Sequence, residues 1–270
     1  MCHIICEKSA SIPIKSYSPN LMVHPYLYDS NNKPWHVPIS DVVTKVESLL
    51  SRIHVVVVGP GLGRDRVLLE TVSKIIEGVR SQKKPLVIDA DGLYLIQHNL
   101  DLIRGYSECV LTPNVVEFER LAKAAGMDKP DSTETEPDSR NKRVAELAKR
   151  LGGVIILSKG QVDVISNGEI TLHNDLIGSR KRVSGQGDTL SGALGTFLAW
   201  HLAYQNDLWK HDHEFSTQES KLLGVFGGSA VTRQAAHGAF NDQGRAMTTV
   251  DVTKHVGFAF KTLYGNPVED

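Results

Sequence analysis

The stretch Ser184-Gly185-Gln186-Gly187-Asp188-Thr189-Leu190-Ser191-Gly192 places a glycine-rich turn directly before an apolar, helix-favouring segment, residues 193–204. Glycines let the backbone approach a ligand, and the free N–H groups and dipole of a helix start favour negative charge. The stretch therefore predicts an anion site. A carboxylate beside bound phosphate is unfavourable unless it accepts a proton or faces a metal, so we interpret Asp188 as the base for phosphoryl transfer. A helix N-cap is the ordinary explanation for an isolated Gly-x-Gly-Asp.

Upstream of this stretch, continuous β-branched runs alternate with helical patterns. Continuous apolar character is typical of strands that are covered on both faces, as in a parallel sheet. We therefore predict an α/β fold with a doubly wound, mostly parallel sheet and helices on both faces. Strands are expected at residues 54–58, 85–89, 107–112 and 153–158, and helices at residues 66–81, 92–99, 115–125 and 143–151.

A change of pattern follows the last of these strands. Residues 162–166 and 169–172 flank Asn167-Gly168, which is a β-hairpin signature, so an antiparallel edge is expected. Helices are predicted at residues 190–204, 219–239 and 248–264, and the polar stretches 128–141 and 205–218 are predicted to be surface loops. At 270 residues, the chain is expected to form a single domain over residues 1–270.

Each predicted parallel strand ends in a candidate motif. Ligands bind at the carboxyl ends of strands in doubly wound folds, and packing alone does not readily explain motifs that recur there. The glycines at positions 59, 61 and 63, after the first strand, do not have the Gly-x-Gly-x-x-Gly spacing of dinucleotide-binding proteins. This turn is either a structural tight turn or a turn whose amides face a ligand. The motifs are Gly59-Pro60-Gly61-Leu62-Gly63, Asp89-Ala90-Asp91-Gly92, Thr112-Pro113-Asn114 and Lys159-Gly160.

Two of these motifs have an ordinary explanation beside the functional one. Asn114 and Glu117 have the spacing of a capping box, yet at an ATP phosphate they could hold Mg²⁺ through its waters. Lys159-Gly160 would place a cation and an unhindered backbone at the ligand rim, although a solvated surface lysine is the default explanation. The cluster Arg180-Lys181-Arg182, directly before the glycine turn, is better explained as a polyphosphate funnel than as a solvated charge run.

Bulk properties exclude several classes of function. Thirty basic and 31 acidic residues give a net charge of −1, so neither nucleic acid nor an anionic membrane is an expected partner. Cys2, Cys6 and Cys109 lack metal-ligand spacing, which favours a reducing compartment. The histidines show neither a His-Glu-x-x-His motif nor a Cys/His grouping, so no catalytic zinc and no direct metal ligand are expected. No apolar run reaches about 18 residues and no signal peptide is recognisable, so we expect a soluble, cytoplasmic protein.

Taken together, the motifs resemble those of the ATP-dependent NAD(P)H-hydrate dehydratases, a family of the ribokinase-like superfamily. The resemblance covers essentially the whole chain, including residues 14–19 and His24-Pro25. It rests on the order and spacing of four segments, Val58-Gly59-Pro60-Gly61-Leu62-Gly63-Arg64, Asp89-Ala90-Asp91-Gly92-Leu93, Leu111-Thr112-Pro113-Asn114-Val115-Val116-Glu117-Phe118 and Gly185-Gln186-Gly187-Asp188-Thr189-Leu190-Ser191-Gly192.

The resemblance implies a ribokinase-like fold and a repair reaction in which ATP drives the dehydration of hydrated NADH or NADPH, with Mg²⁺ accompanying ATP. Asp188 would be catalytic and would also contact the substrate. The other substrate-binding residues would be Gly61, Gly63, Asn114, Val115, Val116, Glu117, Phe118, Glu119 and Arg120. The ATP site would be lined by Lys159, Gly160, Gln161, Val162, Asp163, Gly178, Ser179, Arg180, Lys181, Arg182, Val183, Ser184, Gly185, Gln186 and Gly187.

This sequence departs from the family pattern in two places. Family members usually carry Arg-Cys-Gly-Gly-Gln-Gly-Asp where this chain has Arg182-Val183-Ser184-Gly185-Gln186-Gly187-Asp188, so the core of the anion site is retained. The family also usually opens with a β-α unit, whereas this chain starts at what resembles the following strand, residues 3–6. The resemblance therefore predicts that a unit of roughly 30 residues or more is absent, as in a shortened isoform or incomplete gene model.

Alternatives remain open at this point. A small-molecule kinase of the same superfamily, acting on a hydroxymethylpyrimidine or thiazole alcohol, needs the same anion site and base. A catalytically inactive nucleotide-binding protein is the third interpretation, motivated by the absent unit. The sequence leaves a homo-oligomer open, and a mitochondrial form would require an upstream targeting segment.

Overall fold

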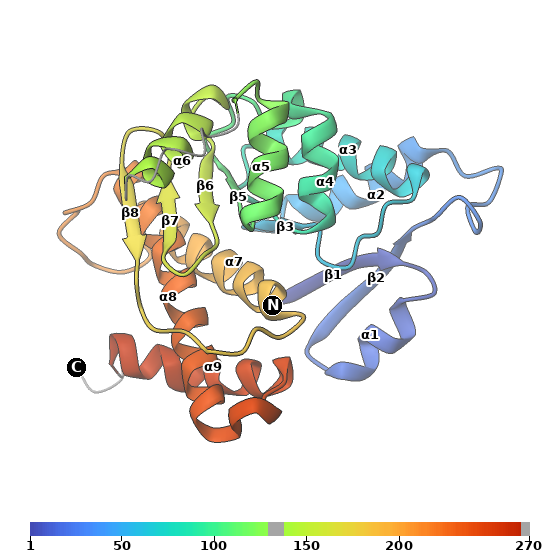
Figure 1. Ribbon diagram of the computed structural model, residues 1–270. Helices are drawn as coiled ribbons and strands as arrows, with labels where there is room; N and C mark the ends of the chain where they lie inside the picture. Colours follow the sequence, from blue (N-terminus) through green and yellow to red (C-terminus); the bar gives the residue numbers. More distant parts are fainter. Residues whose placement is uncertain (129–137, 266–270) are drawn as a thin grey trace.

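The predicted parallel strands form the centre of a six-stranded sheet in the computed structural model, which describes residues 1–128 and 138–265. The strand order is β3-β4-β5-β6-β7-β8. The first four strands pair in parallel, and β7 and β8 continue the sheet antiparallel, which confirms the expected edge hairpin (Figure 1). The bounds are β3 (Val56–Val58), β4 (Leu86–Ile88), β5 (Cys109–Leu111), β6 (Ile155–Ser158), β7 (Asp163–Ser166) and β8 (Thr171–Asn174).

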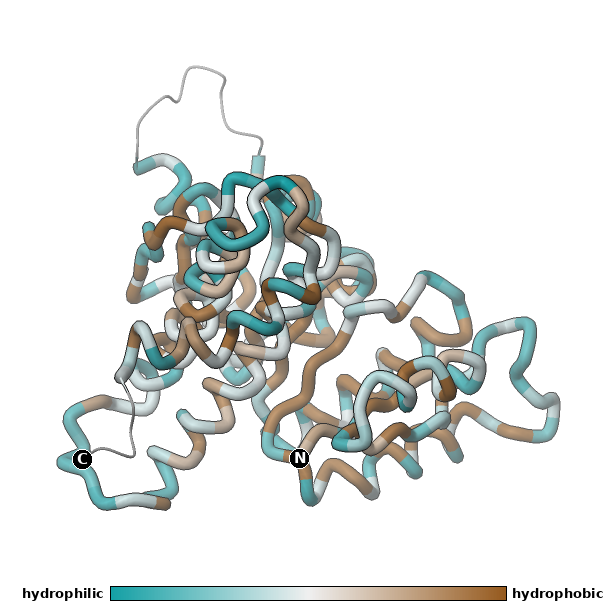
Figure 2. Tube along the Cα trace, turned by 90° about the horizontal axis from the view of Figure 1, so that it is seen from below, coloured by the Kyte–Doolittle hydropathy of each residue, from teal (hydrophilic) through white to brown (hydrophobic). Residues whose placement is uncertain are grey.

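Helices cover both faces of this sheet, so the predicted fold class is confirmed. Successive residues of a strand point to opposite faces. In β4, Leu86 and Ile88 pack into one core with helices α2 to α6, while Val87 packs into a second core with α7 and α8. The helices are α2 (Ile39–Leu50), α3 (Arg66–Ser81), α4 (Asp91–His98), α5 (Val115–Ala124), α6 (Ser139–Arg150), α7 (Gln186–Gln205) and α8 (Thr217–Gln243). Figure 2 shows hydrophobic stretches running through the centre of the molecule.

The first 50 residues contain elements that the periodicity did not reveal. Strand β1 (Cys2–Glu7) pairs in parallel with β2 (Leu21–Leu27) as a separate two-stranded sheet, and helix α1 (Ser11–Tyr17) connects them. Only β1 was expected. Pro25 obscured β2, since proline lacks the N–H that a ladder needs, and Pro13 obscured α1. Leu27 is buried in the core shared with α2 and α3, so this part packs against the larger sheet.

The C-terminal part is helical, as predicted. Helix α8 leads through a short turn, η2 (Gly244–Ala246), to α9 (Thr249–Tyr264), and η1 (Leu100–Leu102) lies between α4 and β5. Helix α7 begins at Gln186, four residues before the predicted start at Leu190, because glycine has low intrinsic helix propensity and tertiary contacts override it here. Across residues 1–128 and 138–265, no helix combines the length and the apolar character needed to cross a membrane.

Candidate active site

The turn after β3 contacts the turn after β4. Gly59 has a φ of +121°, and a Cβ there would lie 1.8 Å from the carbonyl oxygen of Asp89. A Cβ on Gly92 would lie 3.2 Å from the Gly59 Cα. Only glycine fits position 59, because the conformation and the space both exclude a side chain. Two motifs that were expected at the same edge of the sheet are therefore in contact.

A buried carboxylate connects three elements below this edge. Asp89, at the end of β4, is 2% exposed. Its Oδ1 accepts a hydrogen bond from Lys159 Nζ at 2.8 Å, at the end of β6, and its Oδ2 accepts one from Ser191 Oγ at 2.9 Å, in the first turns of α7. Lys159 is therefore the partner of a buried anion, and its interpretation as a solvated surface lysine is wrong.

Asp188 lies in the first turn of α7, beside the buried pair. Gly185 occupies the N-cap position with a φ of +84°, so the alternative interpretation of Asp188 as the N-cap is wrong. The residue is exposed and therefore accessible to a ligand. Partial burial of the carboxyl group and the nearby Asp89 carboxylate raise the pKa of Asp188, while Lys159 opposes the increase. A raised pKa makes the carboxylate a stronger base.

The backbone at the start of α7 offers donors for an anion. The amides of Gly185 and Gly187 have no acceptor within the described parts of the chain. The loop is held from outside by Thr249, at the start of α9, whose hydroxyl donates to the Ser184 carbonyl oxygen. Free N–H groups at the positive end of a 20-residue helix can bind phosphate oxygens. The start of α7 thus offers donors at the predicted anion site, and anion binding there stays a prediction.

The turn after β5 lies next to Lys159, whose backbone N–H donates to the Pro113 carbonyl oxygen at 2.9 Å. The Asn114 side chain accepts bonds from the amides of Val116 and Glu117, and Glu117 Oε2 accepts from the Asn114 N–H at 2.8 Å. The ordinary interpretation of this pair as a capping box is confirmed. The capping box uses one oxygen of Glu117, and its partly exposed carboxylate stands at the site edge, which leaves water-mediated Mg²⁺ binding a prediction.

The remaining predicted substrate residues on α5 point in different directions. Val115, Val116 and Arg120 are exposed, whereas Phe118 is buried in the core. Glu119 forms two hydrogen bonds with Arg143 of α6, at 2.8 and 2.9 Å. The side chains of Phe118 and Glu119 therefore stabilise the packing of α5, and any contact that these two residues make with a ligand would come from the backbone.

The turn after β3 and that after β4 are also joined at the surface. Gly63 donates its N–H to Asp91 Oδ2 at 3.1 Å, and Arg64 Nε bonds Asp91 Oδ1 at 2.9 Å. Gly61 and Gly63 are exposed, with φ values of +66° and +76°. The turn is thus fixed at its end while its glycine backbone remains open, as a ligand-facing turn requires.

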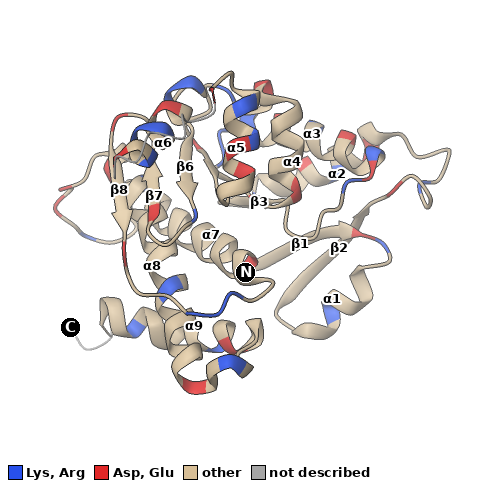
Figure 3. Cartoon of the chain, viewed as in Figure 1, with Lys and Arg blue, Asp and Glu red and all other residues tan. Residues whose placement is uncertain are grey.

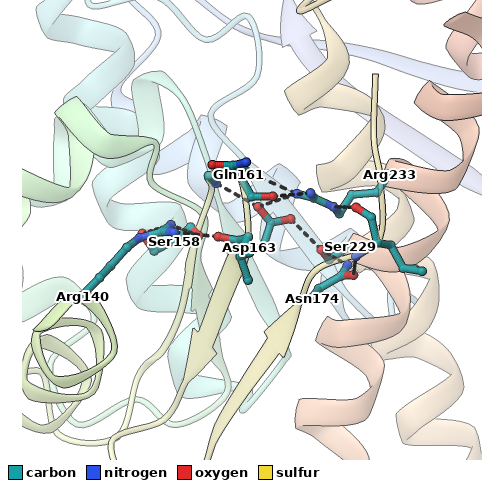
Figure 4. Close-up of polar contacts among 10 residues, drawn as sticks. Arg140, Ser158, Gln161, Asp163, Asn174, Ser229 and Arg233 are labelled. Carbon is teal, nitrogen blue, oxygen red and sulfur yellow. Dashed lines mark hydrogen bonds and ion pairs between the residues drawn. The ribbon is translucent and has the colours of Figure 1, made fainter. Parts of the chain in front are cut away.

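A buried polar network fixes the loop between β6 and β7 (Figure 4). Asp163 Oδ1 accepts from the Gly160 N–H at 2.9 Å and pairs with Arg233 at 3.2 Å, while its Oδ2 accepts from Ser229. Arg233 also donates to the carbonyl oxygens of Gly160 and Gln161. The Asp163 side chain thus holds the loop from inside. Only the exposed part of this loop would be able to contact a nucleotide, through Gly160, Gln161 and Val162.

The basic cluster before α7 is divided between two roles. Lys181 Nζ donates to the carbonyl oxygens of Arg245 and Met247, at 2.6 and 2.8 Å, and so ties the loop to η2. Arg180 and Arg182 are exposed. Figure 3 shows the loop 178–187 as a basic stretch between α7 and α9. Two of the three cations are therefore available to a polyphosphate.

Sequence reasoning missed the residues that support the site. Asp89 was noticed only as part of a motif, and Arg140 and Arg233 gave no signal because their partners are distant in the chain. Arg140 donates to the carbonyl oxygens of Ser158 and Val162 and so supports the loop from the other side. A hollow of about 480 Å³ opens elsewhere, between the end of α3 and η1, and no predicted site residue lines it.

Comparisons with known proteins identify the family of the chain. A family model described as NAD(P)H-hydrate dehydratase matches residues 1–256. An ATP-dependent (S)-NAD(P)H-hydrate dehydratase from Phaeosphaeria nodorum is 45% identical over 269 residues, which cover 100% of this chain and 81% of the relative. A protein of the same name from Neurospora crassa is 44% identical over 280 residues, covering 98% and 79%. A solved ribokinase-like superfamily protein from Enterococcus faecalis aligns with a TM-score of 0.68 and 17% identity, over 98% of this chain and 78% of that one, which supports the fold alone.

Proposed function

This chain belongs to the NAD(P)H-hydrate dehydratase family, and from that premise we propose that it uses ATP to convert hydrated NADH and NADPH back to NADH and NADPH. The activity is that of a lyase coupled to ATP hydrolysis. Its substrates are ATP and a dinucleotide whose nicotinamide ring has gained a hydroxyl group. The observation that carries the proposal is the position of Asp188, an accessible carboxylate with a raised pKa at the mouth of an amide-lined anion site.

Asp188 acts as the general base in this mechanism. It accepts the proton of the hydrate hydroxyl while that oxygen attacks the γ-phosphorus of ATP, and the bond between the γ-phosphorus and the bridging oxygen breaks to release ADP. The amides of Gly185 and Gly187 stabilise the negative charge on the transferred group. The bond between the ring carbon and the phosphate oxygen then breaks, assisted by the lone pair of the ring nitrogen. The neighbouring ring carbon loses a proton to water, which re-forms the ring double bond. The products are the intact dinucleotide, ADP and phosphate.

The two substrates approach from different sides of Asp188. ATP lies along the loop 159–163 and the basic loop 178–187, with Arg180 and Arg182 facing its phosphates. The hydrated ring is held near Gly61, Gly63 and the start of α5. Asp89 and Lys159 lie below; the pKa of Asp188 is raised first by partial burial and then by Asp89, while Lys159 opposes the increase.

Mg²⁺ fits this arrangement as a partner of ATP. Magnesium prefers oxygen ligands and keeps much of its water shell. Glu117 presents a second carboxylate oxygen at the carboxyl edge of the sheet, next to the Lys159 backbone, whereas Asn114 Oδ1 already accepts two amide bonds. When bound, the ion neutralises charge on the polyphosphate. Glu117 would orient the water shell of the ion, and Asn114 would hold Glu117 in place through the capping box.

The cytoplasm is the proposed site of action. Cys2, Cys6 and Cys109 are all free thiols, and burial raises the pKa of Cys6 and Cys109, which keeps both as thiols. Free, unpaired cysteines are typical of a reducing compartment.

The direct test supplies purified protein with hydrated NADH, ATP and Mg²⁺. We expect the near-ultraviolet absorbance of the reduced nicotinamide to return, with one ADP and one phosphate formed per NADH. A kinase of the same fold would instead accumulate a stable phosphoester without free phosphate. That product, or ATP binding without turnover, would contradict the proposal.

A further inference from the structure

The loop between α7 and α8 gathers three side chains that can bind a metal. Asp207, His211 and His213 each offer one donor atom, and these atoms lie within 4.8 Å of one another. Asp207 Oδ1 is 3.1 Å from His211 Nε2 and 3.4 Å from His213 Nε2. The three residues lie within seven positions of the chain, and the turn of the loop brings their side chains together.

These separations match a tetrahedral metal site. With bonds of about 2.0–2.1 Å to imidazole nitrogen and carboxylate oxygen, neighbouring ligand atoms of a tetrahedron are about 3.3 Å apart. The two measured separations lie on either side of this value. All three donor atoms lie within 4.8 Å of one another, so modest side-chain movements bring them to the separations of a tetrahedral site.

His211 is already fixed in place. Its ring stacks on that of Tyr204 with centroids 3.9 Å apart, and its side chain is 8% exposed. Its Nδ1 accepts a hydrogen bond from the His213 N–H at 3.1 Å, and its Nε2 lies 3.0 Å from the Tyr204 carbonyl oxygen. Binding at Nε2 exchanges these two hydrogen bonds, but the stacking and the burial of the ring remain, so the ligand loses little conformational entropy, which favours affinity.

The backbone is unusual at the other two donors. Among the described residues, four other than glycine have a positive φ, and Asp207 (53°) and His213 (56°) are two of them. This region is uncommon for residues with a side chain, so it persists where surrounding contacts hold it. Here it turns both side chains toward His211.

We propose that Asp207, His211 and His213 form a site for a divalent transition metal of the zinc, cobalt and nickel class, with water completing the coordination. Two imidazoles and one carboxylate suit these ions, whereas magnesium prefers oxygen ligands alone. Binding displaces the proton from His211 Nε2; the ring proton then resides on Nδ1, and the His213 N–H gives up its bond there. The ion fastens the loop to the end of α7.

The site is separate from the nucleotide chemistry. Asp207 follows the C-terminal end of α7, while Asp188 lies in its first turn, about 28 Å away along the helix. In Figure 1 the α7–α8 loop lies at the left edge of the molecule, away from the start of α7. The proposed role is therefore structural, and its test does not depend on the dehydratase activity.

Calorimetric titration of chelator-treated full-length protein with Zn²⁺ tests the proposal, with Co²⁺ absorption as a second measurement. We expect one equivalent of Zn²⁺ to bind and a tetrahedral Co²⁺ spectrum to appear. Asp207→Asn and His213→Gln should each weaken this binding roughly tenfold or more, because each removes a direct ligand. Both side chains are more than 60% exposed, so these variants should fold, as an unchanged Tm in chelator would verify.

His98→Gln is the matched control, since His98 is a histidine on α4 with a single backbone bond to Tyr94. It should bind Zn²⁺ like the parent protein. The proposal is overturned if the parent binds no stoichiometric Zn²⁺ at micromolar concentrations. It is equally overturned if the His211→Gln/His213→Gln double variant retains the parental stoichiometry and affinity.

Discussion

Lys159 donates a hydrogen bond to the buried carboxylate of Asp89 at 2.8 Å, which joins the ends of β4 and β6 below the catalytic candidate Asp188. This ion pair is the electrostatic environment of the proposed base. Partial burial and Asp89 raise the pKa of Asp188 and Lys159 lowers it, so the pair contributes to the pH at which Asp188 can accept a proton.

Replacing Asp89 by Asn should move the acidic limb of the pH profile downward. Asp188 must be ionised to act as a base, so activity rises with pH through its pKa. The replacement removes the carboxylate that raises this pKa and leaves Lys159, which lowers it. The measurement is kcat/KM for hydrated NADH against pH, with Asp101→Asn, an exposed aspartate in η1, as the control. An acidic limb that stays in place, or moves upward, contradicts the assignment.

The contact between Gly59 and Asp89 predicts a large difference between two neighbouring glycines. Gly59→Ala should lower the free energy of unfolding by about 3 kcal/mol or more, because the new Cβ would overlap the Asp89 carbonyl oxygen. Gly61→Ala should cost only about 1 kcal/mol, since φ is also positive there but no atom lies within 4 Å of the new Cβ. Urea denaturation of both variants measures the difference, and equal costs would show that the two turns do not pack as described.

Arg233 should matter for both stability and ATP affinity. Arg233→Met leaves the buried Asp163 without its charged partner, so we expect a loss of about 3 kcal/mol in the free energy of unfolding. The loop 159–163 should also loosen and raise KM for ATP more than KM for the hydrate. Arg104→Met is the control, because Arg104 pairs with an exposed aspartate at 3.5 Å and its loss should cost less than about 1 kcal/mol. Unchanged stability and ATP affinity in Arg233→Met would exclude this support of the loop.

His201 predicts how stability depends on pH. Burial and the nearby Lys221 lower the pKa of His201 to about 4, from about 6.5 in the unfolded chain. Between these values the unfolded state binds the proton more readily, so stability is highest above pH 6.5 and falls toward pH 4, by about 3 kcal/mol at most. His201→Gln should flatten this part of the stability curve, whereas the exposed His36→Gln should not. A curve for His201→Gln as steep as that of the parent protein would contradict the assignment.

The part of the fold that follows simple periodicity was predictable from sequence. The buried strands at residues 86–88, 109–111 and 155–158 are continuous apolar runs, and Asn167-Gly168 marked the edge hairpin. The elements of the first 50 residues were not predictable in this way, because Pro13 and Pro25 interrupt α1 and β2. The strands there are also only partly buried. Their packing depends on tertiary contacts that no local pattern encodes.

The candidate site was likewise predictable only where its features are local in the sequence. Backbone features were accessible, because glycine and aspartate at a helix start have local meaning; the anion turn at Gly185 and the capping box of Asn114 are examples. The charged side chains that support the site could not be predicted as partners. Asp89 and Lys159 are 70 residues apart in the chain, and Asp163 and Ser229 are 66 residues apart, so only the folded chain reveals them as partners.

The most direct measurement is the turnover of hydrated NADH by the Asp188→Asn variant, with ATP binding measured in parallel. The replacement retains the size of the side chain and removes the base, so kcat should fall by about 10²–10⁴-fold while the Kd for ATP changes little. A variant that binds ATP normally and no longer forms NADH is the predicted result. Turnover close to that of the parent protein would contradict the account, because proton transfer would then not pass through the carboxylate at the start of α7.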